Sequence, residues 1–262
     1  QQIPVAITVE GANILTRTLI VFGQGVLRGH PHALRDLEAI EKGAPGAAFA
    51  QLLRHGFFSA SLVLRLVIAE LTRGHATSFS ALRGPFASQK RRLSWAALRF
   101  ACLADLTLLV NGPALKKRGH ASGRLSDALS AMFLAFCGLR RAAAEGRRED
   151  DPLVRAAIDT CLARVDVAVQ ESLRESQAPV LGGLLRGPAL WWARLSPLTR
   201  GPRDLDLDGA VERLSEPGEA RERLTSGISL GTAHDPLTAL DAAFVATAAA
   251  ADAEKRIAKG RA

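Results

Sequence analysis

Apolar residues recur at helical spacing along most of this chain. In the first such segment, residues 13–28, apolar positions lie largely three or four residues apart, and Gly29 and Pro31 end the run. Strand-like alternation marks residues 3–9, which we interpret as a short extended lead-in to that helix. The pattern predicts an all-α fold. Further helical runs cover residues 32–42, 47–72, 90–112, 125–145 and 150–175.

Two neighbouring segments depart from the pattern of a one-faced surface helix. Residues 47–72 are apolar on more than one side, so we expect this helix to be buried on several sides. The next run, residues 72–89, is rich in Gly, Ser and Thr and contains Pro85. Such residues favour a connection over a helix, so this run is the best candidate for a linker.

The three long segments after the linker are separated by short breaks. Ser122 or Ser126 is the expected N-cap of the helix over residues 125–145. Two acids followed by Pro152 suit the first turn of the helix over residues 150–175. We predict that the three segments pack as antiparallel helices of a helical bundle.

Neither of the two most apolar segments is a good membrane span, because charged side chains interrupt the ~20 apolar residues that a span requires. Residues 179–198 are different, since Trp191 and Trp192 accompany several leucines and two arginines. This stretch either packs its tryptophans in a core or a domain contact, which we favour, or lies in a membrane interface. The interrupting charges are Arg65 and Glu70 in the first segment and Arg99 and Asp105 in the second.

Composition agrees with an ordinary globular protein. Among 262 residues, 48% are hydrophobic and 23% are charged. Aromatic residues make up only 5%, and Tyr is absent, which adds to the preference for helices. The chain begins at Gln1 without an initiator Met or a secretory signal, so we expect it to be part of a longer protein.

The cysteines and histidines give no strong sign of a metal. The three cysteines lack metal-ligand spacing and lie in apolar helical patterns, so we expect buried, unpaired thiols in a reducing cytoplasm. His30 and His32 flank a proline, a spacing that could hold a metal ion but that more often marks a polar turn. We predict no metal site. The cysteines are Cys102, Cys137 and Cys161.

The chain carries a formal net charge of +8, with basic clusters at residues 90–92 and 116–118. Such clusters can bind nucleic acid, anionic lipid or phosphorylated ligands. Aromatic residues do not alternate with them, and no recognised nucleic-acid motif accompanies them. We therefore interpret the clusters as a solvated basic face and predict no nucleic-acid partner.

The run V-E-G-A-N-I-L-T-R, residues 9–17, carries the candidate chemistry. It resembles the signature in which acyl-CoA dehydrogenases place their catalytic glutamate: Glu-Gly, a small and a polar residue, then an apolar helix with Arg seven positions after the Glu. The flanking residues resemble the long bacterial, FadE-type subgroup in particular. The segments that resemble this subgroup, including its extra C-terminal region, are residues 4–9, 19–25, 125–130, 145–147 and 227–236.

The resemblance implies a role for each residue of the motif. Glu10 would be the base that removes the α-proton of an acyl-CoA, and Gly11 would leave room for the bound thioester. Ala12, Asn13 and Ile14 would contact FAD. Many relatives have Thr where this chain has Ala12, so a side-chain hydroxyl contact is lost and only backbone contacts carry over there.

The resemblance also implies an organisation and a set of partners. Residues 1–75 would be the end of the acyl-CoA dehydrogenase C-terminal helical domain, and residues 76–262 a helical extension. The substrate would be a fatty acyl-CoA, and an electron-transfer flavoprotein or similar acceptor would reoxidise the FAD. We expect a cytoplasmic homo-oligomer with peripheral contact to the inner membrane. The domains that hold the flavin ring would precede Gln1, so this chain alone is expected to be inactive.

Two other hypotheses stay open. Without the resemblance, Glu10 is weak evidence, because a Glu in the first turn of a helix often only complements the helix dipole. The chain could therefore be a non-catalytic, basic helical module for protein interaction or membrane docking. Nucleic-acid binding is a third hypothesis, which rests on charge alone.

Overall fold

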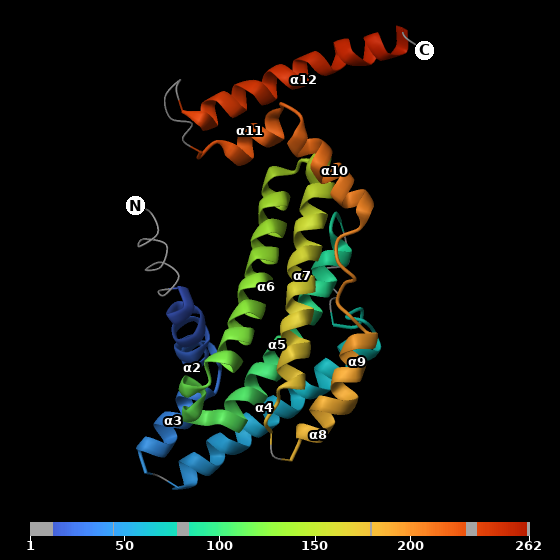
Figure 1. Ribbon diagram of the computed structural model, residues 1–262. Coiled ribbons are helices and arrows are strands. Elements are labelled where there is room, and N and C mark those ends of the chain that lie inside the picture. The colour runs from blue at the N-terminus through green and yellow to red at the C-terminus, as the bar shows by residue number, and fades with distance from the viewer. Residues whose placement is uncertain (1–12, 44, 78–83, 179, 229–234, 261–262) are drawn as a thin grey trace. The chain divides into compact units, whose positions relative to one another are not determined.

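The computed structural model describes residues 13–43, 45–77, 84–178, 180–228 and 235–260 (Figure 1). Every regular element in these ranges is helical, which confirms the predicted all-α fold. The chain forms two compact units, one of residues 1–144 and 157–202 and the other of residues 145–156 and 203–262. The lead-in expected at residues 3–9 lies outside the described residues.

A helical run with changes of pitch opens the described chain. Residues 13–15 are α-helical, η1 (Thr16–Gln24) continues as a π-helix, and α2 (Gly25–Gly29) ends at the predicted break. After a turn, α3 (Ala33–Glu41) begins with a backbone N–H that donates to Nδ1 of His30 at 3.1 Å. The His-Pro-His sequence therefore forms the predicted turn and also satisfies a free N–H group at the start of the next helix.

A glycine turn brings α4 (Pro45–Leu71) back against α5 (Ala87–Asn111). Gly74 has a φ of +78°, and a Cβ there would lie 3.0 Å from Cβ of Trp95. The position needs glycine both for its left-handed backbone and for this close approach. Residues 72–77 form turns and bends, as predicted for the first part of the linker.

The surface of α4 contradicts the predicted burial on several sides. Its buried residues are Gln51, Leu62 and Ala69, whereas Phe57 is 76% exposed. The apolar composition of α4 thus reflects surface that its own unit leaves uncovered. Its exposed large apolar residues are Phe49, Leu52, Leu53, Phe57, Val63, Leu64, Val67, Ile68 and Leu71.

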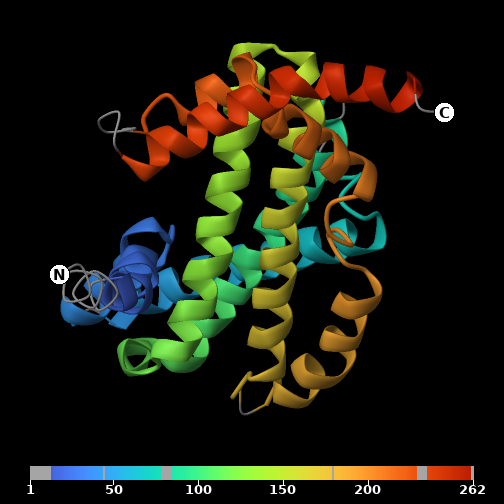
Figure 2. The same cartoon turned by 45° about the horizontal axis from the view of Figure 1, so that its top comes forward.

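Three long helices form the predicted bundle. In Figures 1 and 2, α5, α6 (Gly119–Glu145) and α7 (Asp151–Arg174) lie side by side and alternate in direction. The 3₁₀ helix η2 (Gly112–Lys117) joins the first two. Burying a large apolar side chain contributes about 1.5–3 kcal/mol, so the core between these helices dominates the stability of the unit. The large buried apolar residues there are Trp95, Leu98, Leu103, Leu125, Met132, Leu139, Ile158, Leu162, Val165 and Val169.

The start of α6 corrects the predicted helix cap. The helix begins at Gly119 rather than near residue 125, so Ser122 and Ser126 lie inside it and neither caps it. Both serines are 1% exposed. Ser122 Oγ donates to the Gly119 carbonyl at 3.2 Å, whereas Ser126 Oγ donates outside the helix, to the carbonyl of Arg17. Small polar residues here serve packing rather than capping.

Short helices follow α7 in the same unit: α8 (Gly182–Leu184), the π-helix η4 (Leu185–Ala189) and α9 (Leu190–Leu195). Trp191 is exposed. Trp192 is also partly exposed, and its indole N–H donates to Glu70 Oε2 at 3.0 Å. Of the two alternatives that we favoured, packing in the core is therefore not observed within the described residues, whereas a domain contact stays a prediction. Trp192 is connected to α4 through Glu70.

The second unit is organised around Asp150, at the end of η3 (Arg148–Asp150). This buried carboxylate accepts hydrogen bonds from Arg213 at 3.1 Å and from Arg223. Burial would raise the pKa of Asp150, but the two arginines outweigh it and lower the pKa. One carboxylate thus connects several elements of the unit. The remaining helices are α10 (Asp204–Ser215), α11 (Glu219–Thr225) and α12 (Pro236–Gly260).

Two helices, α4 and α5, are long and apolar enough by length and composition to cross a membrane. A core helix of a soluble protein meets the same criterion. Three of the four charges that interrupt the two helices have protein partners: Glu70 pairs with Arg99, and Asp105 pairs with two histidines. These charges are thus compensated by other side chains of the same unit.

Candidate functional site

Only part of the predicted motif falls within the structure. Glu10, Gly11 and Ala12 lie outside the described residues. Asn13 and Ile14 open the described helix and face solvent, and Ile14 is 60% exposed. The assigned roles stay predictions.

Arg17, the last residue of the motif, is fixed against α6. Its guanidinium forms a bidentate pair with the carboxylate of Asp127, and this hydrogen-bonded pair raises the pKa of Arg17. The Arg17 carbonyl accepts a hydrogen bond from Ser126 Oγ at 2.5 Å. A Cβ at Gly123 would lie 2.9 Å from Arg17 Nη1. The motif is therefore in contact with residues 125–130, a segment that separately resembles the same subgroup.

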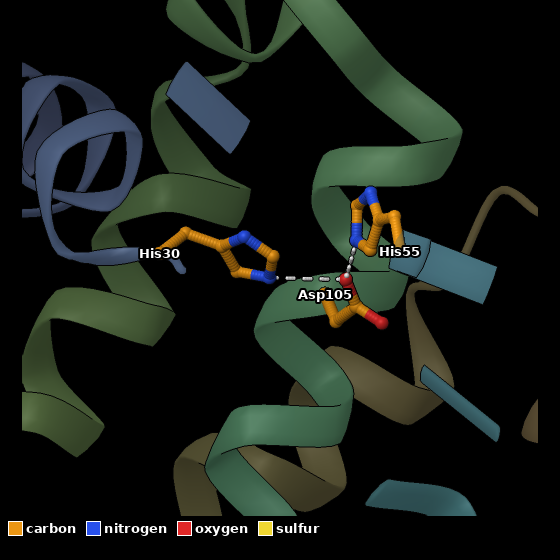
Figure 3. A group of neighbouring side chains, drawn as sticks. All are labelled: His30, His55 and Asp105. Carbon is orange, nitrogen blue, oxygen red and sulfur yellow. Dashed lines mark hydrogen bonds and ion pairs between the residues drawn. The ribbon is translucent and has the colours of Figure 1, made fainter. Parts of the chain in front are cut away.

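A second polar group, here called the histidine cluster, consists of His30, Asp36, His55, Ser59 and Asp105. In Figure 3, His30 and His55 both point at the carboxylate of Asp105. Oδ1 of this carboxylate lies 3.1 Å from His30 Nε2 and 2.9 Å from His55 Nε2. Ser59 Oγ donates to its other oxygen at 2.6 Å, and His55 Nδ1 lies 2.6 Å from Asp36 Oδ2. The cluster thus links the end of α2 with α3, α4 and α5.

The ligand atoms of His30, His55 and Asp105 lie within 4.8 Å of one another, close enough to hold a metal ion. However, His30 Nδ1 accepts the backbone N–H groups of His32 at 3.2 Å and Ala33 at 3.1 Å. A neutral imidazole that binds a metal through Nε2 carries its proton on Nδ1. Here the proton must be on Nε2, where it donates to Asp105. The geometry fits a hydrogen-bonded network better than a metal centre, and the absence of a metal stays a prediction.

The protonation of His55 follows from its two partners. Each ring nitrogen faces a carboxylate oxygen, of Asp36 on one side and of Asp105 on the other, so each must donate a hydrogen. Burial would lower the pKa of His55, but Asp105 and Asp36 outweigh it and raise the pKa. Hydrogen bonds from His30, Ser59 and His55 hold the pKa of Asp105 well below its usual range in spite of its burial. His55 is thus an imidazolium held between two carboxylates.

His32 borders this cluster without sharing its charge. Its ring stacks on that of His55 with centroids 5.2 Å apart and an interplanar angle of 10°. Burial and the neighbouring positive charge of His55 lower the pKa of His32. Gln51 donates to Asp36 Oδ1 at 2.9 Å and lies 3.2 Å from His32 Nδ1. One histidine is therefore held neutral beside another that is held charged.

A mainly apolar cavity of about 450 Å³ borders His30. Its walls come from η1, α2, α4, α5 and α6 and from the turn after α2. Among the described residues that line it, His30 alone brings a titratable group. The lining includes Val21, His30, Phe58, Leu62, Phe100 and Leu129.

A third group, here called the Arg99 cluster, contains Glu70, Trp95, Arg99, Asp166 and Trp192. Arg99 donates to both oxygens of Glu70, at 2.6 and 2.8 Å, and to Asp166 Oδ1 at 3.0 Å. Its guanidinium carbon also lies over the Trp95 ring, 4.4 Å from the ring centroid. Both indole N–H groups donate to Glu70, from Trp95 at 2.9 Å and from Trp192 at 3.0 Å. The cluster joins α4, α5, α7 and α9.

Asp166 sits at the inner end of this cluster. Its second oxygen accepts the backbone N–H groups of Leu198 at 2.6 Å and Thr199 at 3.3 Å. Burial raises the pKa of Asp166 to about 6, although Arg99 and both backbone donors act in the opposite direction. The carboxylate therefore depends on Arg99 for its charge.

The cysteines are unpaired, as predicted, but their burial differs. Cys102 and Cys161 are half-buried, whereas Cys137 is exposed, so the prediction of a buried thiol is wrong for Cys137. Its neighbours on α6, Phe133, Leu134 and Phe136, are exposed as well. The apolar pattern around Cys137 thus marks the outer side of α6 rather than the core.

Comparison with known families defines the protein. The family described as acyl-CoA dehydrogenase, C-terminal, bacterial type, matches residues 27–262. The chain belongs to this family, which confirms the resemblance to the C-terminal part of a bacterial acyl-CoA dehydrogenase. No solved structure matches the chain. Acyl-CoA dehydrogenases are oxidoreductases that generally use FAD, act on acyl-CoA and form oligomers.

We expected a boundary between the helical domain and its extension at residues 75 and 76. The match runs without interruption across residues 75 and 76, where we placed the start of the extension. The compact units instead divide the chain at residues 144, 156 and 202. The boundary between helical domain and extension stays a prediction.

The histidine and Arg99 clusters were missed by sequence reasoning. The available signal was the presence of Arg99 and Asp105 inside a strongly apolar helix, since buried charges need partners. His30 and His32 were identified as a turn, but His30 contacts Asp105, which is 75 residues away, and His55 contacts the same carboxylate from 50 residues away. Spacing along one helix cannot reveal such pairs.

Proposed function

We propose that this chain supplies the catalytic base and the C-terminal helical region of an FAD-dependent acyl-CoA dehydrogenase. The reaction would convert a fatty acyl-CoA to trans-2-enoyl-CoA in fatty-acid β-oxidation. The observation that carries the proposal is the family match, which begins at residue 27, shortly after the motif at residues 9–17. The helical run of residues 13–29 contains the end of the motif and the first residues of the matched region, so the two are structurally continuous.

The proposed chemistry assigns one step to Glu10. Its carboxylate takes the α-proton of the thioester while the C–H bond at the β-carbon releases a hydride, and the Cα–Cβ double bond forms. Bound FAD would supply the acceptor for that hydride and its two electrons. Gly11 would allow the thioester to approach the backbone, and Ala12, Asn13 and Ile14 would contact the cofactor. An apolar site would raise the pKa of the glutamate toward that of an effective base.

The partners and location are further parts of the proposal. An electron-transfer flavoprotein or similar acceptor would reoxidise the flavin, and the enzyme would be a cytoplasmic homo-oligomer. The exposed apolar side of α4 supports oligomerisation or cover by other domains, because a large exposed apolar surface usually marks an interface. Peripheral contact with the inner membrane is supported by the exposed Trp191.

The test is the variant Glu10→Gln in the full-length enzyme with FAD. Glutamine keeps the size of the side chain but cannot accept the α-proton, so FAD and acyl-CoA should still bind. The rate of flavin bleaching on anaerobic mixing with acyl-CoA should fall by at least ~10²–10⁴-fold, the usual contribution of a general base. Glu38→Gln, an exposed acid on α3, is the matched control and should bleach normally. Bleaching at an undiminished rate in Glu10→Gln would show that the base lies elsewhere.

A non-catalytic membrane-docking role is the second candidate, favoured by the apolar surface of α4 and by Trp191. Sedimentation of the full-length protein with anionic vesicles tests it directly. Binding that disappears in Trp191→Ala, together with normal bleaching in Glu10→Gln, would favour docking over catalysis by this chain. An absence of vesicle binding would remove this candidate.

A further inference from the structure

The end of the motif at residues 9–17 rests on one face of α6. Residues Gly119, Gly123, Ser126 and Asp127, here called the α6 seat, follow one another at spacings that place them on one side of a helix. Arg17 and Asp127 are 110 residues apart in sequence. The seat therefore joins the motif at residues 9–17 to a region that we assigned to the C-terminal extension.

The seat is shaped to receive the motif helix closely. A Cβ at Gly123 would lie 2.9 Å from Nη1 of Arg17, and a Cβ at Gly119 would lie 3.8 Å from Cγ2 of Thr18. A larger residue at Gly123 would displace the guanidinium that pairs with Asp127. Small residues on α6 thus stand where the motif helix passes.

The seat also fixes the backbone of the motif helix. Ser126 is 1% exposed, and its hydroxyl donates to the carbonyl of Arg17 at 2.5 Å. Arg17 is the second residue of the nine-residue π-helix η1. π-Helical turns are rare and occur frequently at functional sites. A hydrogen bond from a neighbouring helix holds the backbone just where the helix changes pitch.

The ion pair is poorly suited to stabilising the fold. The side chains of Arg17 and Asp127 are 47% and 49% exposed, and exposed ion pairs contribute little to stability. Its bidentate geometry instead fixes the direction of the guanidinium, which is the property that an orienting contact needs.

We propose that Asp127 and Ser126 are positioning residues, which hold Arg17 and thereby fix the segment that carries Glu10. This inference rests on the proposed function of Glu10. The described helix is continuous from residue 13 through Arg17, so fixing Arg17 fixes the helix start from which the glutamate segment extends. A displacement of ~1 Å in a reacting group can cost ~10²-fold in rate. The C-terminal region would therefore act in catalysis through the placement of the base.

The test compares Asp127→Asn and Ser126→Ala with Glu171→Gln in the full-length enzyme with FAD. Glu171 pairs with Arg124 of the same helix α6 at 3.6 Å but does not contact the motif, so it controls for loss of an ion pair on α6. Flavin bleaching should slow by about 10- to 100-fold in Asp127→Asn. It should slow less in Ser126→Ala and not at all in Glu171→Gln. FAD content, melting temperature and the dissociation constant of acyl-CoA should stay unchanged.

A further readout separates positioning from simple structural support. If Asp127 places the base, the apparent pKa in the pH profile of bleaching should shift in Asp127→Asn, and Asp127→Glu should recover part of the rate. A wild-type rate in Asp127→Asn would overturn the proposal. So would a slow rate that comes with an equal loss of FAD content or melting temperature, or an equal loss of rate in Glu171→Gln.

The pattern of bleaching rates distinguishes an error in the proposed function of Glu10 from an error in the proposed role of the α6 seat. If Glu10→Gln bleaches normally while Asp127→Asn is slow, Glu10 is not the base, and the seat positions some other group on the motif. If Glu10→Gln is inactive while Asp127→Asn bleaches normally, the assignment of Glu10 as the base is supported and the positioning role of the α6 seat is rejected.

Discussion

Two polar clusters share helix α5 but hold it by different means. The Arg99 cluster is built on a guanidinium, which donates to two carboxylates and a backbone carbonyl. The histidine cluster is built on His55, whose imidazolium lies between Asp36 and Asp105. Both bind α4 to α5, and they lie six positions apart on α5, at Arg99 and Asp105.

The difference lies in what can remove the central charge. A guanidinium stays protonated throughout the accessible pH range, so the Arg99 cluster is a permanent connection between α4, α5, α7 and α9. An imidazolium loses its proton within the physiological range once its partners cannot hold it. The bundle thus has a fixed connection at Arg99 and a proton-dependent connection, next to the motif region, at His55.

The largest effect is expected from Arg99→Met. Methionine keeps much of the aliphatic stem but leaves the buried Asp166 and the partly buried Glu70 without a cation. The free energy of unfolding, measured by urea denaturation, should fall by about 3–5 kcal/mol, the usual result of breaking a buried ion pair on one side. Adding Glu70→Gln and Asp166→Asn should recover part of this loss, because it removes the unpaired charges.

Arg124→Met is the matched control for this variant. Arg124 pairs with Glu171 at a partly exposed position, where an ion pair contributes about 0–1 kcal/mol. Equal losses in Arg99→Met and Arg124→Met would contradict the assignment of the Arg99 cluster as the main polar connection of the bundle.

A smaller loss is expected from Asp105→Asn. The change keeps the volume of the side chain but removes the charge that His30, His55 and Ser59 share. Hydrogen bonds to charged groups contribute about 1.5–3 kcal/mol, so the free energy of unfolding at pH 7 should fall by that amount. Asp208→Asn, an exposed aspartate on α10, should change it by less than about 0.5 kcal/mol. An unchanged midpoint in Asp105→Asn would show that the histidine cluster does not stabilise the fold.

The pH dependence of His55→Gln distinguishes the two clusters further. Because the folded state raises the pKa of His55, its contribution is complete below the unfolded value of about 6.5 and is lost as the pH rises through the folded pKa. The melting temperature of the wild type should therefore exceed that of His55→Gln by more at pH 6 than at pH 9. About 1 kcal/mol corresponds to ~2–4 °C for a chain of this size.

The lowered pKa of His32 acts in the opposite direction, since its neutral form is favoured on folding. The difference between wild type and variant is for this reason more informative than the wild-type curve alone. A difference that stays constant from pH 6 to pH 9 would contradict a charged His55. Arg99→Met should give the opposite slope, because loss of the guanidinium raises the pKa of Asp166 further above about 6, so the loss of stability should grow as the pH rises.

The sequence was sufficient to predict the helices and insufficient to predict which surfaces meet. Periodicity located the bundle because each of its helices has an apolar stripe, and the Gly29–Pro31 break was found because both residues end helices. Burial was mispredicted for α4 and Cys137 for one reason. An apolar side of a helix reports a surface that must be covered, but it does not say whether the cover comes from this chain.

In the candidate site, too, the sequence shows the local feature but not the long-range contact. The motif at residues 9–17 is local, so its resemblance was visible in the sequence, whereas its seat is made by a helix more than a hundred residues away. Ser126 was expected to cap a helix because serine favours such positions. Its actual partner, the Arg17 carbonyl, depends on how two helices cross, which local preference does not determine.

Cys102 offers the finest test of the comparison, because it lies on α5 between Arg99 and Asp105. Burial, with a further contribution from Asp105, raises the pKa of Cys102 to about 12. Thiol reagents attack the thiolate, so Cys102 should react at least ~100-fold more slowly than the exposed Cys137 at pH 8. The rates are read from mass spectrometry of peptides after timed labelling, with Cys137→Ser to identify the fast phase.

The labelling rate of Cys102 also shows which cluster keeps this part of α5 packed against α4. Asp105→Asn lowers the nearby negative charge and loosens the contact with α4, so labelling of Cys102 should accelerate while labelling of Cys137 stays unchanged. Arg99→Met should accelerate it as well, and more strongly if the fixed connection controls opening of the helix pair. Because labelling proceeds through rare open states, the effect appears even where the melting temperature hardly moves. Equal rates for Cys102 and Cys137 in the wild type would mean that α5 is not enclosed at this position, and both clusters would then have to be reassigned as surface contacts.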